Sequence, residues 1–145
     1  MLLPDVNVLI YAHREDSIPE HAKYAAWLTA LATGDEPFAL STLVLVGFTR
    51  IVTNARIFDP PTTHETAMAF LDELTSRPNA RIISPGPNHV RVWQRLCLVS
   101  DATGKLVADA QHAAVAVEHG CTLVTVDADF SRFPGLRWHH PLTAK

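Results

Sequence analysis

KLVADAQHAAVAVEHGCTLVTVDADF, residues 105–130, combines a helical pattern with a strand pattern. From Lys105 to His119, apolar side chains recur on one helical face, and Gly120 stands where a helix ends in a left-handed residue. Thr122–Val126 follows as a run of apolar and β-branched residues, which is typical of a buried strand. A helix that leads directly into such a strand indicates an α/β fold with parallel strands.

The remaining sequence alternates in the same way between short apolar runs and helical segments. The predicted strands are Leu2–Pro4, Phe38–Leu40, Arg81–Ser84, Thr122–Val126 and a short Leu136–Trp138. The predicted helices are Val6–Arg14, a helix capped by Ser17 with Pro19 in its first turn and ending near Thr33, a helix capped by Ser41 or Thr42 and ending near Thr53, His64–Ser76 capped by Thr63, Asn88 to about Val99, and Lys105–His119. We therefore expect a three-layer α/β/α sandwich around a central parallel sheet.

Length and composition restrict the class of protein further. A chain of 145 residues is too short for two ordinary domains, so we expect a single domain over residues 1–145. Hydrophobic residues make up 48% and charged residues 19%, which is typical of an ordered globular chain. A net charge of −3 excludes a protein that grips nucleic acid by electrostatic attraction alone. We expect a cytoplasmic protein, because the sequence shows neither a membrane segment nor the basic start of a signal peptide.

Four aspartates occupy positions that are unusual for surface acids. Asp5 follows the first predicted strand, and Asp127 and Asp129 follow the fourth. Asp109 falls within the apolar arc of the helix over residues 105–119. Because burying an unpaired carboxylate costs several kcal/mol, Asp109 requires a partner or a ligand.

Three of these acids also have a purely structural interpretation. Asp5 can cap the helix that follows it, and Asp129 can cap the short turn after the fourth strand. Asp109 can form a buried salt bridge. Asp127 is not explained as a cap, because the predicted turn begins only after it.

The predicted fold brings these acids close together. In an open α/β sheet, sites form outside the carboxyl ends of the strands where the strand order reverses. If the first and fourth strands flank that point, Asp5 and Asp127 are neighbours, and the helix before the fourth strand brings Asp109 to the same crevice. Converging carboxylates either share protons or bind a hard divalent cation, and oxygen ligands select Mg²⁺ or Mn²⁺ over zinc. We predict that Asp5, Asp109 and Asp127 bind the metal and, with Asp129, catalyse phosphodiester hydrolysis.

Three segments, in this order, resemble the PIN-domain ribonucleases. Asp5–Leu9 is similar to their opening D-x-N/S motif, Asp109–Gly120 to the helix of their third acid, and Leu123–Phe130 with Phe133–Gly135 to their closing T-x-D-x-D-F segment. The resemblance covers essentially the whole chain and is to the toxins of VapBC-type bacterial toxin–antitoxin pairs. It implies a sheet ordered 3-2-1-4-5 and a Mg²⁺- or Mn²⁺-dependent endoribonuclease that cuts tRNA, rRNA or mRNA. It also implies a homodimer that a small cognate antitoxin holds inactive.

One position departs from the family pattern. Members usually carry a glutamate on the helix after the second strand, within V-L-x-E-F-x-R, where this chain has Val44-Leu45-Val46-Gly47-Phe48-Thr49-Arg50. Gly47 therefore removes one carboxylate from the expected site. Three interpretations remain open: Asp129 or a water completes the metal ligands, Gly47 makes room for another group or a partner, or the protein is a weak catalyst.

Several further residues are weaker candidates for a role in RNA cleavage. A histidine can position a phosphate or donate a proton, an asparagine or a threonine can orient a carboxylate, and arginines can contact phosphates. Each of them also fits an ordinary structural or surface role. These residues are His112, Asn7, Thr125, Arg50 and Arg56.

Two other functions also remain open. A PIN-fold binding module that has lost turnover through Gly47 would still bind an antitoxin or RNA. A haloacid-dehalogenase-like phosphatase needs a second aspartate where this chain has Asn7, and neither Lys105 nor Lys145 is convincingly placed for its lysine.

Apolar residues at helical spacing on the second and fourth helices are expected to be mostly core, with part of their surface receiving a partner or a second subunit. These residues are Trp27, Leu28, Leu31, Phe70 and Leu74.

Overall fold

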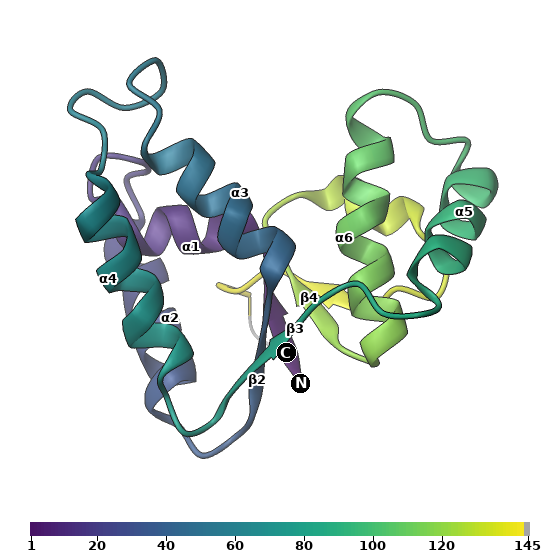
Figure 1. The fold of residues 1–145 in the computed structure, drawn as a ribbon, viewed down its shortest axis with the longest axis horizontal. Coiled ribbons are helices and arrows are strands. Elements are labelled where there is room, and N and C mark those ends of the chain that lie inside the picture. Colours follow the sequence, from purple (N-terminus) through teal and green to yellow (C-terminus); the bar gives the residue numbers. More distant parts are fainter. Residues whose placement is uncertain (144–145) are drawn as a thin grey trace.

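A five-stranded parallel sheet separates two groups of helices in the computed structural model, which describes residues 1–143 (Figure 1). The strands are β1 (Leu2–Pro4), β2 (Phe38–Ser41), β3 (Ala80–Ile83), β4 (Thr122–Val124) and β5 (Trp138–His139). The helices are α1 (Val6–His13), α2 (His21–Thr33), α3 (Thr42–Val52), α4 (His64–Thr75), α5 (His89–Ser100), α6 (Lys105–His119) and the 3₁₀ helix η1 (Ala128–Arg132). The strand order is β3-β2-β1-β4-β5, so the predicted three-layer fold and the order 3-2-1-4-5 are confirmed.

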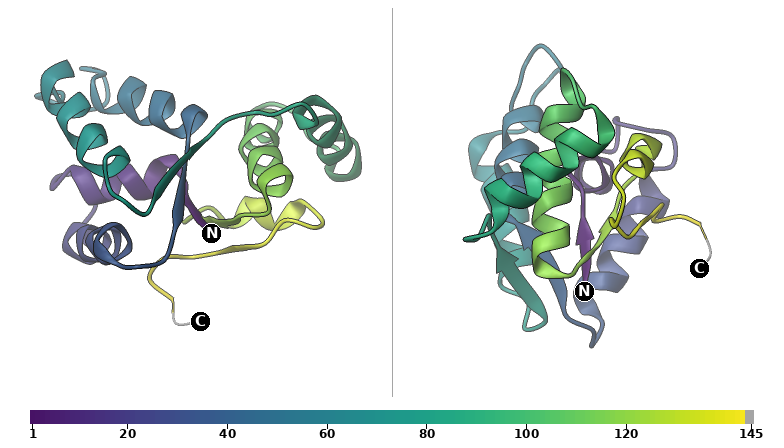
Figure 2. Two further views of the ribbon diagram at one scale, coloured as in Figure 1. Left: turned by 60° about the horizontal axis from the view of Figure 1, so that its bottom comes forward. Right: turned by 90° about the vertical axis from the view of Figure 1, so that its right-hand side faces the viewer.

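Each face of the sheet is covered by its own hydrophobic cluster. Helices α1 to α4 pack on one face, whereas α5 and α6 pack on the other (Figure 2). Adjacent residues of β2 serve opposite clusters, because Ala39 packs with α6 and Leu40 packs with the helices of the first group. The central strands β1, β2 and β4 are therefore largely buried, and a polar site is confined to the ends of these strands.

The strand order reverses between β1 and β4, which lie side by side. Leu3 pairs with Leu123 and Pro4 pairs with Val124. The last bond of this ladder runs from the Asp5 N–H to the Val124 carbonyl at 2.9 Å, because the backbone then turns into α1. β4 loses its partner there and ends at Val124, so the prediction that it extends to Val126 was wrong.

Two other strands are also shifted from their predicted bounds. β3 covers Ala80–Ile83 instead of 81–84, because it pairs residue by residue with β2. β5 covers Trp138–His139 instead of 136–138, because these residues pair with the last two residues of β4. Both differences arise from pairing between distant segments, which local patterns do not contain.

The predicted caps of α3, α4 and α6 are confirmed, and the predicted cap of α2 is wrong. Ser41 and Thr63 cap α3 and α4 with their side chains, and Gly120 ends α6 at a φ of 67°. Ser17 does not cap α2. Its hydroxyl donates to the carbonyl of Arg14 at 2.6 Å and closes the turn after α1, so α2 begins only at His21.

Within residues 1–143, no helix combines the length and apolarity that crossing a membrane requires.

Candidate active site at the carboxyl ends of β1 and β4

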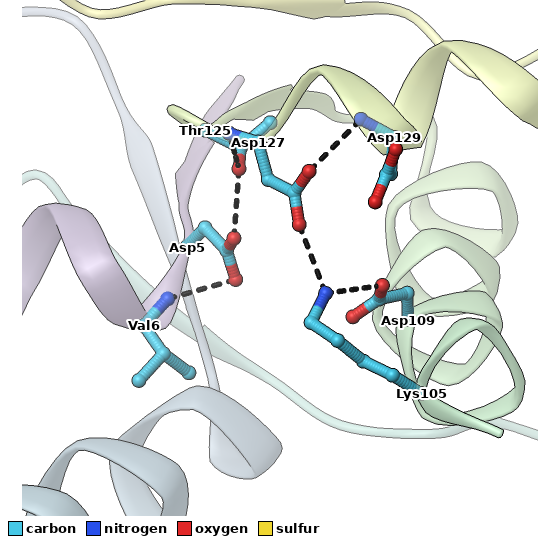
Figure 3. Close-up of polar contacts among 7 residues, drawn as sticks. All are labelled: Asp5, Val6, Lys105, Asp109, Thr125, Asp127 and Asp129. Carbon is cyan, nitrogen blue, oxygen red and sulfur yellow. Dashed lines mark hydrogen bonds and ion pairs between the residues drawn. The ribbon is translucent and has the colours of Figure 1, made fainter.

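Asp5 links the end of β1 to the start of α1 and to β4 (Figure 3). Its side chain is buried, with 7% of the residue exposed. Oδ1 accepts the Val6 N–H at 2.8 Å, which confirms Asp5 as the cap of α1, and Oδ2 accepts the Thr125 hydroxyl at 2.8 Å. The predicted bond between Thr125 and a site carboxylate is therefore confirmed. Each carboxylate oxygen has two acceptor positions, so these bonds leave Asp5 able to bind a cation.

Asp127 forms the entrance to η1. Its backbone N–H donates to the Thr125 hydroxyl at 3.1 Å, and its Oδ1 accepts the Asp129 N–H at 2.9 Å. Asp127 is thus the cap of the turn, and the expectation that Asp129 has this role was wrong. The helical turn begins at Ala128, earlier than its sequence suggests. Asp129 is exposed and joins the group through its backbone.

Asp109 lies on the core-facing side of α6, as the helical wheel predicted, and is 9% exposed. Its Oδ2 accepts a bond from Lys105 Nζ at 2.7 Å, and the same Nζ donates to Asp127 Oδ2 at 2.9 Å. The salt-bridge interpretation of Asp109 is therefore confirmed, and Lys105 connects two of the predicted site acids (Figure 3).

Sequence reasoning missed the role of Lys105, which it had considered only for a phosphatase. The spacing of four residues between Lys105 and Asp109 on one helix was the available signal. A phosphatase of that kind would use the acid after the first strand, which is Asp5 here. Lys105 instead contacts Asp109 and Asp127, so this geometry gives that alternative no support. Lys145 lies outside the described residues.

The ion pairs shift the proton affinity of two groups. The hydrogen bond to Asp109, supported by Asp127, raises the pKa of Lys105 above its ordinary value despite partial burial. Burial alone would raise the pKa of Asp127, but hydrogen bonds from Lys105 and the Asp129 N–H, with the charge of Lys105, lower it. The lysine is therefore charged and Asp127 is ionised at neutral pH.

The carboxylates of Asp5, Asp109 and Asp127 are oxygen ligands of the kind that a hard divalent cation prefers. Within residues 1–143, no three His, Cys, Asp or Glu side chains converge closely enough to hold a metal ion together. Asp109 and Asp127 nevertheless share one cation, the ammonium of Lys105, and Asp5 lies at the end of the adjoining strand. Mg²⁺ needs only one or two protein carboxylates besides water and phosphate oxygens. Metal binding by Asp5, Asp109 and Asp127 stays a prediction.

Gly47 brings α3 against the start of α1. A Cβ atom at this position would lie 3.0 Å from Val6 Cγ2, and Val6 directly follows Asp5. The helix after β2 therefore reaches the neighbourhood of the site, as the family pattern implied. Val6 fills the space that Gly47 leaves, so a larger side chain there requires Val6 to move.

The other weak candidates have fewer contacts. His112 is half-buried on α6, and its Nδ1 has no hydrogen-bond partner among the described residues. Asn7 is half-buried in the first turn of α1, and Arg50 and Arg56 are exposed. Their roles in cleavage stay predictions.

A groove of about 170 Å³ lies between α2 and α4 on the face of the sheet covered by α1 to α4. Three of the five apolar residues predicted for this surface line the groove, namely Leu28, Phe70 and Leu74. Leu28 and Leu74 are buried and belong to the hydrophobic cluster. The prediction that these residues are mostly core is thus confirmed for Leu28 and Leu74, whereas Trp27, Leu31 and Phe70 are half-buried and pack against the cluster. The groove leaves part of this surface accessible.

Comparison with known proteins extends over almost the whole chain. Residues 2–136 match the family model of the PIN domain. VapC ribonuclease Mb2897 of Mycobacterium bovis is 46% identical over 142 residues, which cover 98% of this chain and 96% of that protein. Ribonuclease VapC25 of Mycobacterium tuberculosis is 42% identical, with coverage of 97% and 99%. The structure of VapBC2 from Rickettsia felis bound to a promoter DNA fragment shares the fold, with a TM-score of 0.71, 22% identity and coverage of 96% and 97%. The chain belongs to the PIN domain family.

Proposed function

We propose that this protein is an endoribonuclease that acts as the toxin of a VapBC-type toxin–antitoxin pair. Its relatives at 46% and 42% identity are named ribonucleases. Structures with the same fold include VapBC-1 from nontypeable Haemophilus influenzae and a toxin–antitoxin complex from Klebsiella pneumoniae. The observation that carries the proposal is the meeting of Asp109 and Asp127 on one ammonium, beside Asp5 and at the strand-order reversal.

Each of the four acids is assigned a role in hydrolysis. We assign Asp5, Asp109 and Asp127 to hold a Mg²⁺ or Mn²⁺ ion, which would supply an activated water and stabilise the departing oxygen. Thr125 and the Val6 N–H fix both oxygens of Asp5 at the end of β1. We assign Asp129, whose exposed side chain follows Asp127 on η1, to supply an oxygen in place of the carboxylate that Gly47 lacks.

The burial of the acids supports the same assignment. Asp5 and Asp109 are buried beside residues of the two hydrophobic clusters, so few waters screen their charge. Asp127 is more accessible, with 26% of its side chain exposed. The site thus combines two buried carboxylates with a partly exposed one, which a polymeric substrate can reach from solvent.

The partners follow from the same assignment. We infer a small cognate antitoxin, an RNA substrate and a cytoplasmic location, where that substrate is found. A homodimer is part of the proposal and is tested by the mass of the purified protein in solution.

The test is cleavage of total bacterial RNA by the purified, antitoxin-free protein with Mn²⁺, with EDTA, and with two aspartate variants. Asp109→Asn removes a site charge, whereas Asp101→Asn makes the same chemical change at an exposed left-handed residue after α5. We expect discrete products that require Mn²⁺, disappear with Asp109→Asn and persist with Asp101→Asn. Cleavage that survives EDTA or Asp109→Asn refutes the carboxylate mechanism.

The same assay decides between the alternatives. No cleavage by folded protein that binds Mn²⁺ favours the PIN-fold binding module, in which Gly47 has ended turnover. Hydrolysis of a small phosphomonoester without cleavage of RNA favours the phosphatase.

A further inference from the structure

Lys105 occupies a position that the helix itself does not favour. It is the first residue of α6, where the positive end of the helix dipole disfavours a cation. A lysine that precedes an acid by four residues is also the weaker orientation of such a pair. Nevertheless, Nζ lies 2.7 Å from Asp109 Oδ2 and 2.9 Å from Asp127 Oδ2. The attraction of the two carboxylates, which come from different elements, therefore determines where the ammonium lies.

The ammonium occupies acceptor positions on Asp109 and Asp127 that could otherwise bind a metal ion. Both bonds end on Oδ2, and Figure 3 shows the lysine side chain reaching from α6 to a point between the two carboxylates. One positive charge there compensates two negative charges in part. Asp5 is bonded to Val6 and Thr125 and not to the lysine. The lysine therefore occupies two of the three predicted metal ligands, Asp109 and Asp127.

The lysine side chain can also move away from both carboxylates into solvent. Its side chain is 69% exposed, compared with 13% for Asp109 and 26% for Asp127. Moving the ammonium into water therefore breaks two ion pairs without unpacking the core. The pair with Asp127 is exposed and the pair with Asp109 is partly buried, and water screens both through the exposed ammonium.

We propose that Lys105 is an internal counter-cation that competes with the divalent cation for Asp109 and Asp127. This inference rests on the metal-dependent function proposed above. In the metal-free protein, the ammonium holds the two carboxylates together and limits their repulsion. When a metal ion binds, the ammonium leaves both oxygens, so the protein binds the metal more weakly than the same acids would without the lysine.

The experiment measures Mn²⁺ binding to the full-length protein by isothermal titration calorimetry at neutral pH. Lys105→Met keeps the length of the side chain and removes its charge. Lys23→Met makes the same change at an exposed position of α2. We expect Lys105→Met to bind Mn²⁺ roughly three- to tenfold more tightly than the unchanged protein, from the loss of one or both weak ion pairs. Lys23→Met should bind Mn²⁺ like the unchanged protein.

Two further measurements separate competition from a structural role. Lys105→Arg keeps the charge, so it should bind Mn²⁺ within about twofold of the unchanged protein. Without metal, Lys105→Met should unfold at a lower temperature than the unchanged protein, and Mn²⁺ should raise its melting temperature by a larger amount. If Lys105→Met does not fold, as judged by circular dichroism, Lys105→Gln takes its place in the titration.

The outcomes distinguish this inference from the function on which it rests. Equal Mn²⁺ affinity in Lys105→Met and the unchanged protein overturns the competition alone and leaves the metal site in place. Weaker binding in Lys105→Met also overturns it, because the lysine would then organise the acids for the metal. If the unchanged protein binds no Mn²⁺ in the titration, both the inference and the metal-dependent part of the proposed function fail.

Discussion

Replacing Thr125 with valine tests how the β1–β4 edge holds the candidate site together. The Thr125 hydroxyl donates to Asp5 Oδ2 at 2.8 Å and accepts the Asp127 N–H at 3.1 Å. The residue is completely buried, at 0% exposure, so water cannot reach the hydroxyl from outside. Valine keeps the shape of the side chain and removes both bonds in one step.

The expected loss follows from these two bonds. A hydrogen bond to a charged group contributes about 1.5–3 kcal/mol, and a buried N–H left without a partner costs about 1–3 kcal/mol. Because Asp127 is partly exposed, water can satisfy some of the second loss. We expect Thr125→Val to lower the free energy of unfolding by about 2–4 kcal/mol. At this chain length, that corresponds to a fall in melting temperature of roughly 4–16 °C.

The assay is urea unfolding followed by circular dichroism in EDTA, with RNA cleavage measured in parallel below the unfolding transition. Thr125→Ser is the matched control, because it keeps the hydroxyl and loses one methyl group, at about 1 kcal/mol. We expect the valine variant to lose at least tenfold in cleavage rate, since Asp5 Oδ2 is no longer held, and the serine variant to lose much less. A valine variant within about 0.5 kcal/mol of the unchanged protein, or a serine variant equally destabilised, refutes the reasoning.

Three further predictions concern other parts of the molecule. Burial and neighbouring positive charges lower the pKa of His13 below 6.5, so its contribution to stability is complete above about pH 6.5 and is lost as the pH falls through the folded-state pKa. Between about pH 7.5 and 5, the free energy of unfolding measured with urea should depend less on pH in His13→Gln than in the unchanged protein. Glu118 accepts two backbone N–H groups of the β3–α5 connection at 2.9 Å each, so Glu118→Ala should destabilise the protein by about 1 kcal/mol and speed hydrogen exchange at these two amides. Gly47→Ala should gain less than the roughly 1 kcal/mol of helix propensity, because its Cβ meets Val6 at 3.0 Å, and combining it with Val6→Ala in a double-mutant cycle should restore the difference.

The sequence was sufficient to predict those features of the site that depend on the order of strands and helices. Asp5 and Asp127 each follow a strand, and adjacent parallel strands place their carboxyl ends at one edge, so their proximity was predictable. The burial of Asp109 followed from the helical wheel alone. These features depend on periodicity and topology, which a single sequence contains.

Details that depend on side-chain reach were not predictable in the same way. The contact between Lys105 and Asp109 is local, but Lys105 reaches Asp127 across 22 residues of chain through a flexible side chain. The end of β4 at Val124 depends on where β1 turns into α1, and the cap formed by Asp127 depends on that end. Similarly, the sequence showed that position 47 lacks a carboxylate. It did not show that the Val6 side chain fills the space beside Gly47.

The bond between Thr125 and Asp5 joins positions 120 residues apart in the chain, and this separation has a consequence during protein synthesis. A ribosome that adds about 5–20 residues per second makes Asp127 roughly 6–24 s after Asp5. Until β4 has been made and inserted beside β1, the growing chain carries Asp5 and Asp109 but lacks both Thr125, which holds Asp5, and Asp127. A product that terminates before β4 never acquires the site. The RNA of the ribosome that makes this proposed nuclease is therefore protected from the unfinished chain by the topology of the sheet.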